Sequence, residues 1–147
     1  MPTLLLPLPD LAATEALGAR IAAWLRTGDS VLLAGPLGAG KSALARALLR
    51  ALTHDPALEV PSPSYTLVQG YPSPLGLVQH YDLWRLDGPG ALTELGWDAD
   101  EGVALVEWPD RLGHLTPPDA LYVDLSYDGE ARRAALRGWP GRLEHLA

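Results

Sequence analysis

The stretch Gly35-Pro36-Leu37-Gly38-Ala39-Gly40-Lys41-Ser42 fits the pattern G-x-x-x-x-G-K-[ST], the phosphate-binding P-loop. An apolar run at residues 31–34 precedes it, as a buried parallel strand would, and Leu44 and Leu48 follow it at helical spacing. A strand, a glycine-rich loop and a helix form the context that this motif requires. Lys41 is also the only lysine among the 11 basic residues. We therefore interpret the stretch as a site for the phosphates of a nucleotide.

The composition predicts one globular domain over residues 1–147. The chain is 48% hydrophobic and 20% charged, as in ordinary globular proteins, and it is long enough for a single core. It contains neither a run of about 20 apolar residues, as a membrane span needs, nor the basic start of a signal peptide. We expect a cytoplasmic protein without a membrane association. The absence of cysteine excludes disulfides and zinc-thiolate sites.

The charge argues against direct binding of nucleic acid. The net charge is −7, and no run of Lys or Arg is long enough to form a basic footprint. Two interpretations of the acidic surface stay open, namely plain solubility and contact with a basic protein partner. Independent binding of tRNA or DNA is therefore not expected.

Two apolar runs end close to a carboxylate. Residues 77–85 predict a strand that carries Asp82 near its end, and residues 103–107 are four apolar residues followed by Glu107, the Walker B form. Behind a P-loop, such carboxylates bind magnesium or orient the attacking water. Which of the two has which role stays open. His80 lies on the same strand face as Asp82, and we interpret it as a structural residue.

Further polar side chains are candidates for nucleotide contacts. Ser62, Ser64 and Thr66 follow a proline-rich approach, where nucleotide-binding proteins place a switch segment that senses the terminal phosphate. Thr14 is either a helix-surface residue or a group whose hydroxyl points at the base. Arg132, beside an expected hairpin turn, either reaches the phosphates or is an ordinary exposed arginine. A serine and proline turn is the alternative for the switch segment.

The remaining pattern predicts the elements around the P-loop. We expect an edge strand at residues 4–6, a helix capped by Asp10 that ends near residues 27–28, and a P-loop helix that ends near Thr53. A turn is predicted at residues 71–76 and a hairpin at residues 121–136. Trp108 is expected in the core, and the alternatives are that it covers the site or contacts a partner. The predicted fold class is α/β, a three-layer P-loop NTPase-like fold whose mixed sheet has a parallel core and an antiparallel extension.

The base preference favours adenine. Guanine-specific switch proteins use an Asn-Lys-x-Asp element, and this sequence contains no asparagine and no second lysine. We therefore expect ATP, bound with Mg²⁺, whose hydroxyl ligand would come from Ser42.

Four blocks of the sequence together resemble the TsaE family in order and spacing. They are the P-loop at 35–42, Ser-Pro-Ser-Tyr-Thr-Leu-Val at 62–68, His-Tyr-Asp-Leu-Trp-Arg-Leu at 80–86, and Val-Glu-Trp-Pro at 106–109. The resemblance runs from Pro7 to about Pro109. TsaE proteins are bacterial ATPases required for threonylcarbamoylation of the adenosine beside the anticodon in certain tRNAs, and they act with the proteins TsaD and TsaB.

This resemblance implies roles for the site residues. ATP would contact Gly35, Leu37, Gly38, Ala39, Gly40, Lys41, Ser42 and Ala43, with Thr14 and Arg132 as further candidates. Catalysis would depend on Lys41, Asp82 and Glu107, and magnesium would be bound by Ser42, Glu107 and Asp82. The resemblance also implies an ATPase that is weak alone, is stimulated by its partners and resets the TsaD-TsaB complex. A small-molecule kinase and a nucleotide-gated binding module are the alternatives.

Overall fold

The computed structural model describes residues 2–36, 38–61, 68–86, 88, 90–92, 97 and 102–147. Leu37 and the predicted switch residues Ser62, Ser64 and Thr66 lie outside the described residues.

A seven-stranded mixed sheet in the order β1-β7-β6-β2-β5-β4-β3 forms the centre of the molecule. The strands are β1 (Thr3–Leu8), β2 (Ser30–Ala34), β3 (Val68–Ser73), β4 (Gly76–Asp82), β5 (Val103–Glu107), β6 (Leu121–Asp128) and β7 (Ala131–Arg137). Strands β6, β2, β5 and β4 pair in parallel, whereas β7, β1 and β3 pair antiparallel with their neighbours. The predicted mixed sheet with a parallel core and an antiparallel extension is confirmed.

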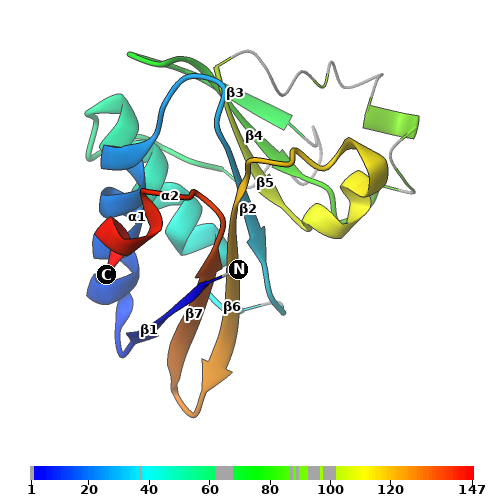
Figure 1. The fold of residues 1–147 in the computed structure, drawn as a ribbon. Coiled ribbons are helices and arrows are strands. Elements are labelled where there is room, and N and C mark those ends of the chain that lie inside the picture. The colour runs from blue at the N-terminus through cyan, green and yellow to red at the C-terminus, as the bar shows by residue number, and fades with distance from the viewer. Residues whose placement is uncertain are drawn as a thin grey trace.

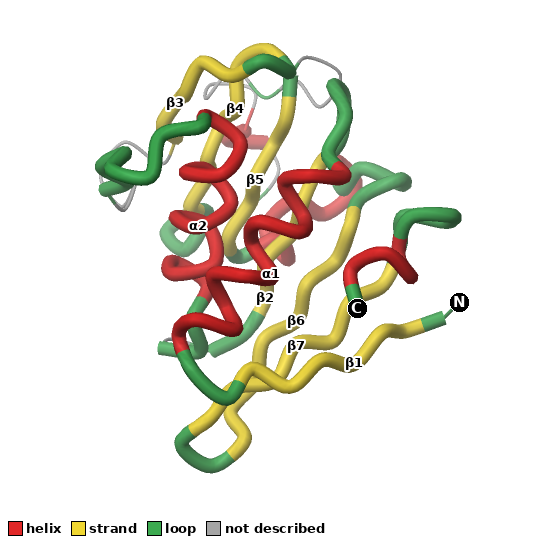
Figure 2. The backbone as a smooth tube through the Cα atoms, turned by 90° about the vertical axis from the view of Figure 1, so that its left-hand side faces the viewer, coloured by secondary structure: helices red, strands yellow, loops and turns green. Residues whose placement is uncertain are grey.

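Two α-helices cover one face of the sheet, α1 (Leu11–Trp24) and α2 (Lys41–Thr53), as Figure 1 shows. The predicted cap of α1 is present, because the Asp10 side chain accepts a hydrogen bond of 2.9 Å from the Ala13 amide. The helices lie side by side in front of the strands (Figure 2). Gly18 permits this approach, since a Cβ there would lie 2.8 Å from the Ala47 Cβ. Among the described helices, none is long and apolar enough to cross a membrane.

Side chains of the central strands alternate between two cores. On β2, Val31 and Leu33 pack under the helices, and Leu32 packs on the opposite face. The second core is covered by the 3-10 helix η2 (Pro109–Leu115) and by irregular chain that contributes Leu86. The outer layer on this face is therefore built differently from the two-helix layer on the other. The 3-10 helix η3 (Leu143–Leu146) packs near α1.

Two boundary predictions were wrong. Helix α1 ends at Trp24 rather than at residues 27–28, because the chain turns to an extended conformation at Leu25. Residues 71–76 are not all turn: β3 continues to Ser73, and Tyr71 pairs with Val78 of β4. Proline is tolerated in β3 because this strand lies at the edge of the sheet, where its missing amide breaks no ladder bond.

Candidate functional site

Lys41 is the first residue of α2 and points back into its own loop. Its side chain is 5% exposed. The ammonium donates hydrogen bonds to the Gly35 carbonyl and, at 3.5 Å, to the Pro36 carbonyl. It also lies 3.7 Å from the centre of the Trp108 ring, a cation–π contact. The lysine donors that would meet phosphate oxygens are thus engaged by the loop itself.

Acidic groups surround this lysine. Burial lowers the pKa of Lys41 below its usual value, and the negative charges of Glu107, Asp82 and Asp110 oppose that shift. A buried ammonium with several carboxylates nearby is a site of concentrated charge, of the kind that functional sites carry. The structure therefore brings together the three residues that the sequence nominated for catalysis.

The carboxylates come from the ends of two parallel neighbours. Asp82 is the last residue of β4 and pairs in register with Glu107, the last residue of β5. Glu107 is 4% exposed, and its Oε2 lies 2.7 Å from the Nε2 of His80. Asp82 is half-buried, and its Oδ1 accepts a hydrogen bond of 3.2 Å from the Trp84 amide. The two acids thus lie at the carboxyl ends of neighbouring parallel strands, where ligands of α/β folds bind.

The residues present fit a magnesium ion that also takes ligands from a nucleotide. Within the described part of the chain, no three His, Asp or Glu side chains are grouped to bind a metal alone. Magnesium prefers hard oxygen ligands, and it is commonly bound by one or two carboxylates together with phosphate oxygens. Ser42, exposed in the first turn of α2, supplies a hydroxyl, and Asp82 and Glu107 supply the carboxylates.

A cavity of about 220 Å³ lies between the P-loop, α1 and the β6–β7 hairpin. Thr14 lines it and is 5% exposed, so the helix-surface interpretation of this residue is wrong. Arg132 also lines it, and its Nε donates to the Gly38 carbonyl at 3.3 Å. The other lining residues are Leu8, Pro9, Asp10, Leu11, Gly38, Gly40, Ala43, Glu130 and Ala131. Both candidate contacts of the nucleotide thus face one hollow beside the P-loop.

Two residues of the site have contacts that go beyond their first interpretation from the sequence. Trp108 is half-buried and packs against the second core, and it also covers Lys41, which was one of the alternatives. Its ring centre lies 4.4 Å from that of Trp84. Its backbone is left-handed, with φ 59°, which turns the chain sharply after β5. His80, interpreted as structural, contacts Glu107. Strand periodicity placed His80 on the face of Asp82, but only the strand order shows that Glu107 lies beside that face.

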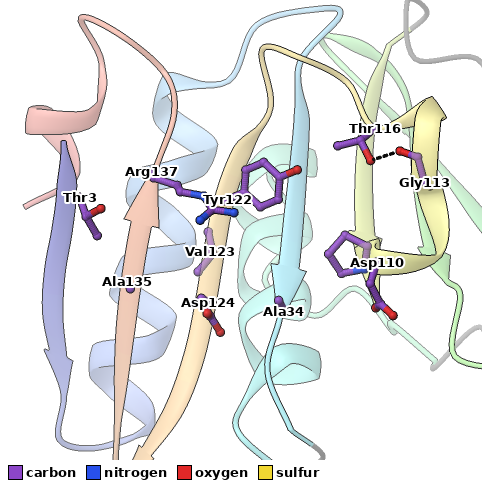
Figure 3. Close-up of a pocket in the computed structure, with 11 residues that line it drawn as sticks. Thr3, Ala34, Asp110, Gly113, Thr116, Tyr122, Val123, Asp124, Ala135 and Arg137 are labelled. Atoms are coloured by element: carbon purple, nitrogen blue, oxygen red, sulfur yellow. Dashed lines mark hydrogen bonds between the residues drawn. The ribbon is translucent and has the colours of Figure 1, made fainter. Parts of the chain in front are cut away.

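A larger cavity of about 340 Å³ lies elsewhere, between η2 and strands β1, β7, β6 and β2. Figure 3 shows Arg137 beside Tyr122, whose ring centre is 4.3 Å from the guanidinium carbon. Asp110 and Asp124 are further polar side chains of this cavity. No described residue of the P-loop lines it. It is therefore separate from the hollow that Thr14 lines.

Comparison with known proteins identifies the family. The model of the family described as "Threonylcarbamoyl adenosine biosynthesis protein TsaE" matches residues 8–135. Proteins named "tRNA threonylcarbamoyladenosine biosynthesis protein TsaE" are similar to the chain: that of Rickettsia felis is 33% identical over 82% of this chain and 71% of the relative. That of Synechocystis is 38% identical over 74% of this chain and 71% of the relative.

A solved structure supports the fold. The crystal structure of Bacillus subtilus YdiB aligns with a TM-score of 0.77 over 99% of this chain and 91% of that one, at 23% sequence identity. The fold described above is therefore similar to one found by experiment. Together with the family model and the relatives, the residues of the site lead to one assignment: the chain belongs to the TsaE family.

Proposed function

We propose that this chain is a P-loop ATPase with a P-loop NTPase-like fold, required for threonylcarbamoylation of the adenosine beside the anticodon in tRNA. The observation that carries the proposal is the convergence of Lys41, Asp82 and Glu107, from three separate elements, at one edge of the sheet. The relatives' names supply the pathway. ATP hydrolysis would reset a partner complex of TsaD and TsaB, and tRNA would be met only through that complex.

The side chains have separate tasks in this proposal. Lys41 exchanges the carbonyls of Gly35 and Pro36 for phosphate oxygens, so that its charge is balanced by the nucleotide. Ser42 and one of the two carboxylates would hold Mg²⁺, which when bound neutralises phosphate charge and fixes the phosphate geometry. The other carboxylate of the pair Asp82 and Glu107 would orient the attacking water.

The cavity lined by Thr14 and Arg132 is the proposed place of the nucleoside. It adjoins Gly38, Gly40 and Ala43, and its lining includes both a buried hydroxyl and a cation. Because the cavity touches the start of α2, a nucleotide with its phosphates on the loop would extend its sugar and base in that direction.

Reconstituted tRNA modification with TsaD and TsaB tests the proposal. Lys41→Ala removes the phosphate contact, and Glu107→Gln removes a charge while keeping the shape, so both variants should abolish modification and ATP turnover. Glu144→Gln, an exposed position on η3, makes the same chemical change away from the site and should leave both at the wild-type level.

Three outcomes decide among the candidates. Wild-type modification by both Lys41→Ala and Glu107→Gln would sink the proposal. Intact ATP after long incubation with the partners would instead select a nucleotide-gated binding module. Transfer of phosphate from ATP to a metabolite in the absence of any partner would select a small-molecule kinase.

The two carboxylates can be separated by a metal probe. Titration of Mn²⁺ into the nucleotide complex, followed by electron paramagnetic resonance, reports metal affinity without turnover. The variant, Asp82→Asn or Glu107→Gln, that loses activity and keeps Mn²⁺ affinity identifies the residue that orients water.

A further inference from the structure

His80 and Glu107 form a buried polar pair in the centre of the site. His80 is 2% exposed and Glu107 is 4% exposed, and the two side chains meet at 2.7 Å between Nε2 and Oε2. Burial of a carboxyl group is costly unless a hydrogen bond satisfies it, and this contact supplies one to Glu107. The pair is therefore more than a chance approach of two side chains.

The strand register explains why these two residues meet. His80 pairs with Leu105, and Asp82 pairs with Glu107, on the parallel neighbours β4 and β5. Positions two residues apart share a strand face, so His80, Asp82 and Glu107 all lie on the same side of the sheet. His80 lies two residues before Asp82 on β4, farther from the carboxyl end of the strand. It contacts Glu107 from this buried side.

The chemistry of the pair fixes its direction. A carboxylate that binds a metal only accepts hydrogen bonds, so in this role of Glu107 the Nε2 of His80 is the donor to Oε2. The other carboxylate oxygen, Oε1, has no hydrogen-bond partner among the described residues. The bond thus engages one oxygen of Glu107 and leaves the second for a different ligand.

We propose that His80 is a positioning residue, which orients Glu107 through this hydrogen bond so that Oε1 is presented to the metal ion. The inference rests on the proposed function and takes Glu107 as the carboxylate of the pair that holds magnesium. Partners that hold a metal ligand in place commonly change metal affinity by about 10- to 100-fold when they are removed. His80 itself touches neither metal nor nucleotide in this role.

Two substitutions separate the loss of the hydrogen-bond donor from the loss of the imidazole ring. In His80→Gln the side-chain amide nitrogen is as many bonds from Cα as Nε2, so the donor to Glu107 is kept. In His80→Asn the amide nitrogen is one bond shorter and does not reach. Should the Asn chain fail to fold, as judged by thermal unfolding, His80→Leu removes the donor with an apolar side chain and takes its place.

The readout is the affinity of Mn²⁺ for the complex with ADP, measured by electron paramagnetic resonance. We expect His80→Asn to weaken Mn²⁺ binding by about 10- to 100-fold and His80→Gln to stay within about threefold of wild type. Because His80 acts only through Glu107, His80→Asn should have no further effect in a Glu107→Gln background. Binding of ADP without metal should be equal in all variants.

The failures are distinguishable. Wild-type Mn²⁺ affinity in His80→Asn, equal losses in the Gln and Asn variants, or additive losses with Glu107→Gln would each overturn the positioning role. If the wild-type chain shows no ADP-dependent Mn²⁺ binding, the proposed function itself fails, and this inference fails with it.

Discussion

Replacement of Gly35 by alanine probes how closely the P-loop approaches the sheet. Gly35 has φ +137°, and a Cβ at this position would lie 2.4 Å from the carbonyl oxygen of Leu125 on β6. The contact is with backbone, so no side chain can rotate out of the way. Glycine is thus required here twice, by its conformation and by the space available.

The expected cost has two parts. A non-glycine residue in a sparsely populated backbone region costs about 1–3 kcal/mol. Forcing extra atoms into a packed site costs about 1–3 kcal/mol more. Their sum, about 2–6 kcal/mol, is a large share of the roughly 5–15 kcal/mol that holds an ordinary domain folded. For a chain of this size, it corresponds to a fall in Tm of about 5–20 °C.

Two other glycines are matched controls for Gly35→Ala. Gly129 has φ +62°, and a Cβ added there would meet no atom of the surrounding structure within 4 Å, so Gly129→Ala carries only the conformational cost. Gly138 has φ +100° and a Cβ there would lie 2.3 Å from the Ala120 carbonyl oxygen, away from the P-loop. We expect Gly35→Ala and Gly138→Ala to lose similar stability, Gly129→Ala about 1–2 kcal/mol, and only Gly35→Ala to lose ADP binding.

Urea unfolding followed by tryptophan fluorescence gives the free energies, and ADP titration gives the binding. The reasoning is refuted if Gly35→Ala unfolds with the wild-type midpoint, or if Gly129→Ala loses as much stability as Gly35→Ala. Loss of ADP binding in Gly138→Ala would show that general destabilisation, rather than the shape of the loop, accounts for the effect.

Four further substitutions test three other features of the structure. Burial raises the pKa of Tyr71 above its ordinary 10.0, so above pH 10 the unfolded chain releases a proton that the folded chain retains. The wild type should lose stability there in urea unfolding, and Tyr71→Phe should not; an equal loss in both would contradict this. Arg142 makes hydrogen bonds of 2.7 and 3.1 Å to Asp29, and both side chains are 12% exposed. Arg142→Met should therefore lower the free energy of unfolding by about 2–4 kcal/mol, less than the loss of a fully buried pair would, because solvent partly screens the charges. Arg133→Met, whose ion pair is about half exposed, should cost under about 1 kcal/mol and serves as the comparison in the same unfolding assay. Arg132→Leu should weaken ADP binding by about 2- to 10-fold, because it removes a hydrogen bond to the P-loop. Unchanged affinity would remove Arg132 from the site.

Local patterns predicted the elements around the P-loop well. The apolar run and the spacing of leucines gave β2 and α2, and Asp10 gave the start of α1, because each signal acts over a few residues. The same reasoning failed at residues 71–73, which became strand through pairing with β4. Edge pairing is a contact between segments, so turn residues alone could not predict it.

The buried surroundings of the site also escaped prediction. Thr14 is buried by residues of the β6–β7 hairpin and the P-loop, which are distant from it in sequence. The pattern of helix α1 alone therefore could not predict its burial. Trp108 follows the strand-terminal Glu107, and a left-handed backbone turns it over Lys41. Neither the turn nor the contact has a signature in residue types.

By itself, the sequence determined which residues are candidates for the chemistry: the glycines and Lys41 of the loop, and Asp82 and Glu107 at the ends of two strands. These follow from local spacing and from side-chain chemistry, which need no knowledge of distant contacts. The tertiary structure decided that β4 lies next to β5, and hence that the two acids stand side by side with His80 beneath Glu107. Strand order depends on how the whole chain buries its apolar faces, so no short stretch of residues contains it.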